Sequence, residues 1–322
     1  MKLAVVIPCY RVSEQVLDVI KSIGPEPGAI YIVDDACPEK TGDLVSSRCD
    51  DPRVHVLRLE ENQGVGGATL AGYRAALEDG AEVIVKLDGD GQMDPSLIPS
   101  LVHPIVDGEA DYAKGNRFFD LEGLKSMPVL RLVGNSALSF ASKLSTGYWN
   151  LFDPTNGFTA IHAAVARELP FDRISHRWFF ESDVLFRLGI VRAVVVDVPM
   201  PAVYADETSS LRVRAVLAEF TWKHARNTAK RIFYNYFLRN FSIASIEGVL
   251  GVLFLAFGTW KGTTLWLHGI EVGIPVTSGG VMLSGLPVIV GVQLILAFLG
   301  YDLQNTPREV LHRRLLRRPG RR

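Results

Sequence analysis

Three oxygen-bearing side chains stand at alternate positions in the segment DGDGQ, residues 88–92, directly behind the apolar run 83–87. Asp88, Asp90 and Gln92 offer carboxylate and amide oxygens, the ligands that Mg²⁺ and Mn²⁺ prefer. Mg²⁺ usually takes one or two carboxylates and completes its coordination with phosphate oxygens of a substrate. The two intervening glycines leave room for a ligand to approach the backbone. The segment therefore predicts a divalent metal site shared with a phosphorylated substrate.

Two other motif interpretations of this region fail. A calcium-binding EF-hand loop that begins at the first of these aspartates needs glycine and glutamate where the chain has Met93 and Pro99. The segment GVGGAT, residues 64–69, resembles a dinucleotide-binding glycine motif, but Thr69 replaces the third glycine and the segment does not follow the first strand. We therefore expect neither site, and interpret these glycines as positions where a helix packs closely.

The elements that must position these residues are short apolar runs separated by helical stretches. Residues 13–23 and 66–77 have the apolar spacing of helices. Strands that return about every 25–30 residues with helical spacers are typical of βα units on a parallel sheet. The sequence therefore predicts an α/β fold with a mostly parallel sheet flanked by helices. The expected strands are 3–7, 29–33, 54–59, 83–87, 112–114, 158–162 and 194–198.

Three of the expected strands end in polar or acidic residues. The first ends in Pro8-Cys9-Tyr10, the second in Asp34-Asp35, and the fourth in the DGDGQ segment. In a parallel sheet these ends share one edge, and open α/β sheets bind ligands at that edge. An aspartate pair after a strand can also cap the next helix or form a turn, so the pair alone leaves both interpretations open.

The C-terminal part has the character of a membrane anchor. Residues 243–260 carry one charge and residues 281–301 carry none, and each segment is long enough to cross the hydrocarbon core as a helix. Basic residues precede the first segment and seven arginines lie among the last 15 residues, whereas the loop 261–280 carries only Lys261 and Glu271. This pattern predicts a hairpin with both ends cytoplasmic. Two buried core helices are the alternative.

Composition excludes several classes of protein. The chain has 322 residues and a net charge of −1, so no global charge attracts it to nucleic acid. A hydrophobic content of 48% and a mean hydropathy of +0.18 are high for a wholly soluble protein. The three cysteines have no metal-binding spacing and are expected to be reduced thiols. The N-terminus lacks the pattern of a signal peptide.

Four regions follow from these patterns. We expect a cytoplasmic catalytic domain at 1–210, amphipathic helices at the lipid headgroups at 211–240, a transmembrane hairpin at 241–303 and a basic cytoplasmic tail at 304–322. A solvated helical face is the alternative for the second region. The expected location is a bacterial or archaeal plasma membrane. Small residues in the spans would permit helix packing, including a homo-oligomer: Gly248, Gly251, Gly285 and Gly291.

Eight segments carry a resemblance to a known family. The chain resembles a family-two glycosyltransferase of the GT-A fold, in the polyprenyl-phosphate sugar transferase group that includes dolichyl-phosphate mannose synthase. Its hairpin is similar to that of the bacterial members with two C-terminal transmembrane helices. The matching segments, in family order, are VVIPCY (5–10), IVDDACPEKTGD (32–43), NQGVGGA (62–68), KLDGDGQMDP (86–95), KGNRF (114–118), DPTNGFTAI (153–161), FFESD (179–183) and SSL (209–211).

The resemblance implies roles for individual residues. The family's basic residue in the serine-rich segment is absent at position 211, and Arg212 or Arg214 is expected to replace it. The implied residues are Asp88, Asp90 and Gln92 for the metal; Pro8, Tyr10, Val33, Asp34, Asp35 and Asp88 for the nucleotide; Arg117, Arg131, Asn156, Gly157, Ser210 and Arg212 for phosphates and acceptor; and Asp90, Arg117, Glu181 and Asp183 for catalysis.

The resemblance also implies a reaction. The donor would be a UDP- or GDP-linked sugar, the acceptor undecaprenyl or dolichyl phosphate, and the product inverted. Mg²⁺ or Mn²⁺ and Arg117 would stabilise the charge that builds on the leaving diphosphate. A hydroxyl acceptor would need Glu181 or Asp183 as a base, whereas a lipid phosphate is already anionic. The alternatives are a polysaccharide synthase and a non-catalytic sugar-nucleotide-binding partner of a flippase.

Overall fold

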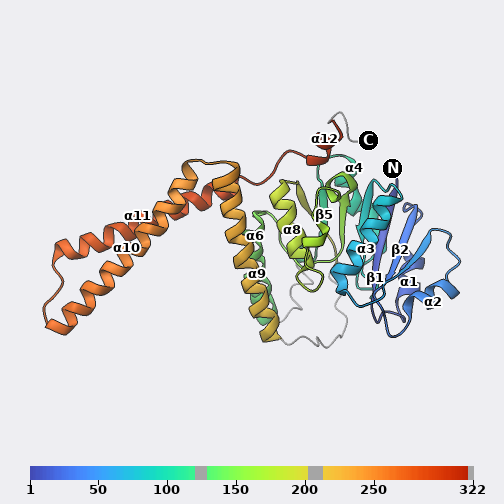
Figure 1. Cartoon of the computed structure of the whole chain (residues 1–322), viewed down its shortest axis with the longest axis horizontal. Helices are drawn as coiled ribbons and strands as arrows, with labels where there is room; N and C mark the ends of the chain where they lie inside the picture. Colours follow the sequence, from blue (N-terminus) through green and yellow to red (C-terminus); the bar gives the residue numbers. More distant parts are fainter. Residues whose placement is uncertain (120–128, 202–212, 318–322) are drawn as a thin grey trace. The chain divides into compact units, whose positions relative to one another are not determined.

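The structure, a computed structural model, describes residues 1–119, 129–201 and 213–317. It divides into two compact units. The first comprises Met1–Thr228 together with Pro307–Arg322, and the second comprises Ala229–Thr306. The β-sheet belongs to the first unit, and two long apolar helices belong to the second (Figure 1).

A seven-stranded sheet forms the centre of the first unit, in the order β3-β2-β1-β4-β6-β5-β7. β6 runs antiparallel to both of its neighbours, and the other paired strands are parallel. The sheet is therefore mostly parallel, as predicted. The strands are β1 (Leu3–Cys9), β2 (Ala29–Asp34), β3 (Val54–Arg58), β4 (Val83–Lys86), β5 (Tyr112–Asn116), β6 (Thr159–His162) and β7 (Val195–Pro199).

Helices cover both faces of this sheet. Alternate residues of β1 point to opposite sides, so Val6 packs in a core with α3 and α8, whereas Val5 packs in a second core with α1 and α4. The helices are α1 (Val16–Ser22), α2 (Thr41–Arg48), α3 (Gly64–Glu78), α4 (Ile98–Val106), α6 (Val129–Thr146), α7 (Ala163–Ala166), α8 (Phe180–Val191), α9 (Val213–Phe233, which runs on into the second unit) and α12 (Leu311–Leu316), with 3₁₀ turns η1 (Pro95–Leu97), η2 (Arg117–Phe119) and η3 (Phe171–Arg173).

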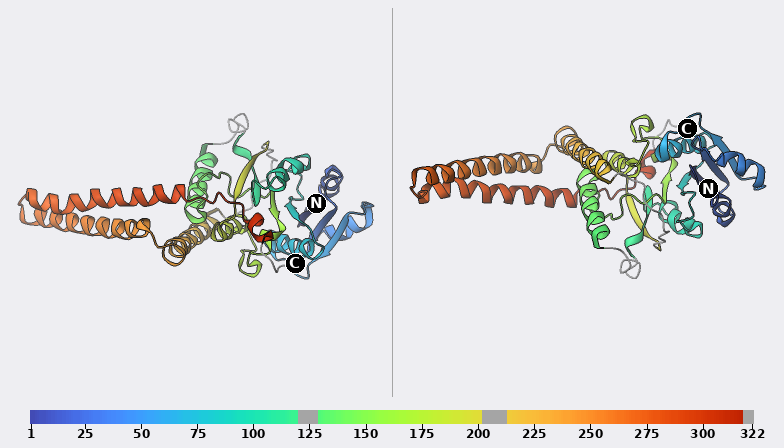
Figure 2. Two further views of the ribbon diagram at one scale, coloured as in Figure 1. Left: turned by 90° about the horizontal axis from the view of Figure 1, so that it is seen from above. Right: turned by 90° about the horizontal axis from the view of Figure 1, so that it is seen from below.

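The second unit is a helical hairpin. α10 (Ile243–Val272) and α11 (Ser278–Gln304) lie side by side in both views of Figure 2, and a π-helical turn, η4 (Tyr234–Arg239), precedes them. Both helices are long and apolar enough to cross a membrane. Only 22% and 11% of their most apolar windows are buried, which argues against two core helices.

Small residues allow the two hairpin helices to approach closely. A Cβ atom on Gly291 would lie 2.8 Å from the backbone nitrogen of Leu255, and one on Gly251 would lie 2.9 Å from the side chain of Ile295. Gly285, in contrast, has no heavy atom within 4 Å of the equivalent position. Gly248 also faces its partner helix, because its added Cβ would lie 3.2 Å from Phe298, so three of the four predicted glycines serve packing within the hairpin.

Candidate active site

The carboxyl ends of β1, β2 and β4 meet at one edge of the sheet, as the sequence predicts. Cys9 at the end of β1 pairs with Asp34 at the end of β2. A Cβ atom on Gly89, just after β4, would lie 3.3 Å from the side chain of Ile7. Because β6 runs antiparallel to β4, its amino end lies at the same edge and brings Gly157 against the DGDGQ segment.

A buried lysine joins two acidic residues at this edge. Lys86, the last residue of β4, has a side chain that is only 1% exposed. Its Nζ lies 2.7 Å from Asp88 Oδ1 and 3.3 Å from Glu181 Oε1, and it donates to the carbonyl oxygen of Gly157 at 3.3 Å. Burial disfavours the ammonium form, but the charges of Asp88 and Glu181 outweigh it and raise the pKa of Lys86. Lys86 is therefore charged at neutral pH.

Burial also changes the pKa of Glu181, the acidic partner of Lys86 in α8. It raises the pKa of Glu181, and the charge of Lys86 only partly compensates. Glu181 Oε1 nevertheless lies 3.3 Å from the Nζ of Lys86, and the Glu181 side chain is 13% exposed. The carboxylate is thus held in an ion pair within the site.

The turn after β4 presents the other predicted metal ligands. The backbone N–H of Gln92 donates to Asp90 Oδ1 at 3.0 Å, and Gly91 between them has a φ of +75°, which favours glycine. Asp94 accepts a hydrogen bond from the N–H of Ser96 at 2.9 Å and caps η1. The carboxylate of Asp94 is therefore engaged at the start of η1.

The oxygen ligands in this turn suit a hard cation whose coordination is completed by oxygens of the substrate. Among the residues that the structure describes, no three His, Cys, Asp or Glu side chains lie together in a way that could hold a metal ion. Asp88 and Asp90 supply two carboxylates and Gln92 an amide, all on partly exposed side chains. This set matches the one or two carboxylates that Mg²⁺ takes when phosphate oxygens fill its remaining positions.

The aspartate pair after β2 holds the amino ends of two helices. Asp34 accepts hydrogen bonds from the N–H groups of Cys37 and Gly42, at 2.8 and 2.6 Å, at the start of α2. Asp35 accepts from Gln63 and Gly64, at 2.7 and 2.9 Å, at the start of α3. The capping role that the sequence left open is therefore present, and nucleotide binding by these carboxylates stays a prediction.

The other predicted nucleotide residues differ in exposure. Tyr10 is 44% exposed, and the guanidinium of Arg11 lies 5.4 Å from the centre of its ring. Pro8 is buried at the end of β1, and the Val33 side chain is fully buried in the core. Of these three, Tyr10 alone offers an exposed side-chain surface on which a base could rest.

Arg117 is held in place by Asp153. Its Nε and Nη2 donate to the two carboxylate oxygens of Asp153 at 2.8 and 2.7 Å, a bidentate pair. Burial opposes ionisation of Asp153, but the hydrogen bonds and charge of Arg117 outweigh it and lower its pKa. Asn156 also donates to Asp153, at 3.2 Å, so the predicted phosphate and acceptor residues share one buried carboxylate.

Asp183 faces different partners from Glu181. Its carboxylate accepts from the N–H of Ser175 at 2.9 Å and from the side chain of Asn227 at 3.4 Å, and it lies 3.7 Å from Arg187. It is buried. The structure thus gives Asp183 a packing role at the start of α8, and its catalytic role stays a prediction.

Four predicted residues cannot be located as side chains, and one of them is Arg214 of α9. Ser210 and Arg212 lie outside the described residues. Arg131 belongs to α6, but its side chain is outside the described part of the structure.

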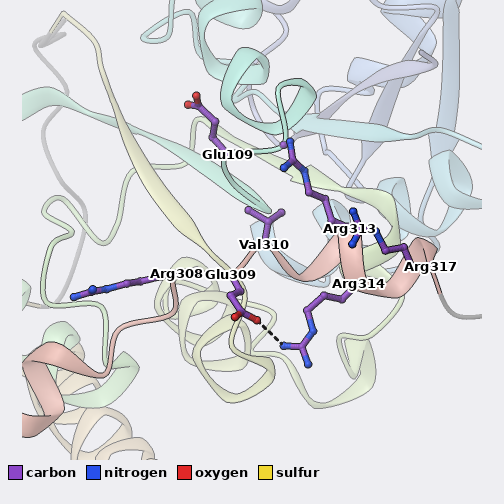
Figure 3. A pocket seen from close by; sticks show the side chains of 8 residues that line it. Glu109, Arg308, Glu309, Val310, Arg313, Arg314 and Arg317 are labelled. Atoms are coloured by element: carbon purple, nitrogen blue, oxygen red, sulfur yellow. Dashed lines mark ion pairs between the residues drawn. The ribbon is translucent and has the colours of Figure 1, made fainter.

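A hollow of about 460 Å³ lies away from this edge. It is lined by Glu109 before β5 and by arginines of the C-terminal segment (Figure 3). β5 is antiparallel to β6, as β4 is, so the amino end of β5 lies at the sheet edge opposite the DGDGQ segment. Figure 3 shows Arg308 pointing away from Arg313, while Arg314 pairs with Glu309 at 3.5 Å. This hollow is therefore separate from the predicted site.

Two residues that the sequence analysis missed are central to the geometry. Lys86 has a sequence signal: a lysine ends an otherwise apolar strand directly before the metal motif. The sequence signal for Asp153 is weaker. This residue begins the segment DPTNG, but nothing in the local pattern indicates that it pairs with Arg117. Contacts between distant segments are not visible in local patterns.

The sequence matches a family of sugar-transferring enzymes. The family model described as "Glycosyl transferase family 2" matches residues 4–169. The chain is 33% identical over 224 residues to an undecaprenyl-phosphate mannosyltransferase from Micrococcus luteus, covering 68% of this chain and 90% of the relative. It is 29% identical over 201 residues to a polyprenol monophosphomannose synthase from Mycolicibacterium smegmatis, covering 61% and 75%.

Solved structures support the fold. A glucosyl-3-phosphoglycerate synthase from Mycobacterium tuberculosis superposes with a TM-score of 0.51 at 16% identity, covering 71% of this chain and 79% of the other. A mannosyl-3-phosphoglycerate synthase from Rubrobacter xylanophilus gives 0.53 at 17% identity, covering 75% and 77%. At such identities the likeness concerns the fold alone.

The chain belongs to glycosyl transferase family 2. It is a glycosyltransferase with a GT-A-type α/β domain, and its curated relatives include the polyprenyl-phosphate sugar transferases that the sequence resembles. The predicted fold class and family are therefore confirmed.

Proposed function

We propose that the protein transfers a sugar from a nucleotide-diphosphate sugar to a polyprenyl phosphate, such as undecaprenyl or dolichyl phosphate, with inversion at the sugar. The observation that carries the proposal is the joining of a family 2 domain to a hairpin of two membrane-length helices in one chain. An acceptor with a long isoprenoid tail must be met at the bilayer surface. Two relatives named for undecaprenyl-phosphate and polyprenol substrates support this acceptor class.

The predicted metal ligands and the fold support a divalent metal ion and a nucleotide-linked sugar as the donor substrate. Asp88, Asp90 and Gln92 would hold Mg²⁺ or Mn²⁺, and Tyr10 would support the base of a UDP- or GDP-linked sugar. A structural relative was solved with Mn²⁺ and UDP, which supports a divalent ion in this fold. When bound, such an ion supplies positive charge that stabilises the leaving diphosphate.

The chain's own residues then hold the reacting groups. Arg117, oriented by its bidentate pair with Asp153, would bind phosphate oxygens of the donor or acceptor. An oxygen of the polyprenyl phosphate attacks the anomeric carbon; the bond from that carbon to the diphosphate oxygen breaks, and the nucleoside diphosphate leaves with the electron pair. The nucleophile is already anionic near neutral pH, so no base is required. The commitment of Glu181 to Lys86 agrees with such an acceptor.

The site would operate on the cytoplasmic side. The basic residues that flank both apolar helices, and their scarcity in the loop between, support a hairpin with both ends in the cytoplasm. The amphipathic part of α9, with exposed Trp222 and Arg226, would lie at the lipid headgroups.

Sugar transfer to lipid tests the proposal. Full-length protein in detergent is incubated with undecaprenyl phosphate, Mg²⁺ or Mn²⁺, and a panel of UDP- and GDP-sugars, and lipid-linked sugar is measured by mass spectrometry. We expect one donor to give product, and Asp90→Ala to abolish it while the melting temperature is kept. Transfer to soluble sugars but never to the lipid phosphate would refute the acceptor. Full activity of Asp90→Ala would refute the metal assignment.

A further inference from the structure

Lys86 is the one fully buried cation among the described residues of the DGDGQ region, and nothing in the reaction proposed above uses it. Its three N–H donors have three acceptors: Asp88 Oδ1 at 2.7 Å, the carbonyl of Gly157 at 3.3 Å and Glu181 Oε1 at 3.3 Å. An ammonium that donates to three groups has no freedom to rotate toward another partner. The position of Lys86 is therefore fixed by contacts in the protein interior, unlike that of a lysine in a surface ion pair.

The charges of this cluster do not cancel. One ammonium faces two carboxylates, and the remaining net charge of −1 attracts a cation. Without the lysine, Asp88 and Glu181 would bring two negative charges into a site where Glu181 is only 13% exposed. Like charges at such burial repel strongly, so Lys86 sets both the charge and the shape of the site.

The geometry also divides the two oxygens of Asp88. Lys86 holds Oδ1, and Oδ2 lies beside Gly157, where an added Cβ atom would be 2.5 Å from it. The same Cβ atom would be 2.5 Å from the Nζ of Lys86. The lysine, the glycine backbone and the aspartate are thus in mutual contact, which fixes the Asp88 side chain in one orientation.

We propose that Lys86 is a positioning residue that locks Asp88 in one rotamer and offsets the charge of Glu181, so that the metal site binds a divalent cation through one oxygen of Asp88 and with moderated affinity. The inference rests on the proposed function for the role of that cation in sugar transfer. Its consequence for cation binding does not rest on that function, because it follows from contacts among the protein's own groups.

The test is a Mn²⁺ titration of full-length protein in detergent, followed by electron paramagnetic resonance of the free ion, without sugar or lipid. Lys86→Met keeps the length of the side chain and removes its charge. We expect Mn²⁺ to bind roughly tenfold more tightly, because a positive charge near the site is lost. In turnover assays kcat should fall, because Asp88 is no longer held.

A double variant covers the case in which Lys86→Met does not fold. Lys86→Met/Glu181→Gln removes one positive and one negative charge and restores the net charge of −1. We expect its Mn²⁺ affinity to return to within threefold of wild type while kcat stays low. A double variant with wild-type kcat would overturn the rotamer role, and one with tenfold tighter Mn²⁺ binding would overturn the charge role.

A second buried lysine provides the control. Lys114 in β5 is also 1% exposed, and its Nζ pairs with Asp197 at 2.9 Å and with the carbonyl of Phe152 at 2.6 Å. Lys114→Met should lower stability but leave Mn²⁺ affinity unchanged.

The inference is overturned by a folded Lys86→Met variant with Mn²⁺ affinity within twofold of wild type, or by a wild type that binds no Mn²⁺. If Mn²⁺ affinity shifts as expected but no lipid-linked sugar forms, the acceptor proposal fails and the role of Lys86 stands.

Discussion

Asp111 and His312 form a buried pair although 201 positions separate them in the chain. Asp111 stands just before β5, and His312 lies in α12, which follows the second apolar helix. Asp111 accepts the backbone N–H groups of Leu311 and His312 at 2.8 and 2.7 Å, and its Oδ1 lies 2.8 Å from Nδ1 of His312. The ring of His312 also stacks on His162, with centroids 4.1 Å apart. The C-terminal segment is therefore fastened to the catalytic unit.

Asp111→Asn should release this segment. An amide of the same shape cannot accept all of these hydrogen bonds, and a buried donor left without an acceptor costs about 1–3 kcal/mol. We expect faster tryptic cleavage after Arg313 and Arg314, measured by mass spectrometry of timed digests, together with a lower melting temperature. Asp107→Asn is the matched control, because that side chain is 46% exposed and lies 3.4 Å from the exposed His103. Equal cleavage rates in the two variants would contradict a fastening role.

Gly157→Ala should disable the site without unfolding the protein. The new Cβ atom would be 2.5 Å from both Asp88 Oδ2 and Lys86 Nζ, so the cluster must shift. Displacement of a catalytic group by about 1 Å commonly costs on the order of 100-fold in rate, and we expect a loss of that size in kcat. Gly134→Ala is the control: no heavy atom lies within 4 Å of its added Cβ, and kcat should not change. If the two variants had similar kcat values, close packing of Asp88 and Lys86 against Gly157 would not be required for activity.

The strands of the sheet and the turn after β4 could be predicted from the sequence. Apolar runs end where polar side chains begin, so the strands and the positions of Asp88, Asp90 and Gln92 could be predicted from local pattern. Asp34 and Asp35 show the limit of such patterns, because the same residue type suits a ligand site and a helix cap, and both carboxylates cap helices here.

The contacts between distant segments could not be predicted. Lys86 meets Glu181 only because α8 packs beside the end of β4, and Asp153 meets Arg117 only because β6 is inserted antiparallel between β4 and β5. Neither pairing has a spacing in the sequence. Recognition of the family supplied the roles of single residues, whereas the partners that orient them came from the fold.

His224 gives the fold a dependence on pH. It is buried between α6 and α8, with Nδ1 2.8 Å from the hydroxyl of Ser145 and its ring against Phe179. Burial lowers the pKa of His224 to about 4 from 6.5. Burial and the charge of His312 lower the pKa of His162 to about 4 as well. Both side chains are therefore neutral in the folded protein at pH values where the unfolded chain already binds protons.

Stability should accordingly be complete above pH 6.5 and fall as the pH drops toward 4, because only the unfolded state takes up the protons in this window. Each histidine contributes about 3 kcal/mol over the whole range. His224→Phe should remove about half of the loss in melting temperature between pH 7 and pH 5, measured by intrinsic fluorescence in detergent. His103→Gln, at a side chain that is 73% exposed, should leave the loss unchanged. If His224→Phe melts with the full wild-type dependence on pH, burial of this imidazole is not the cause.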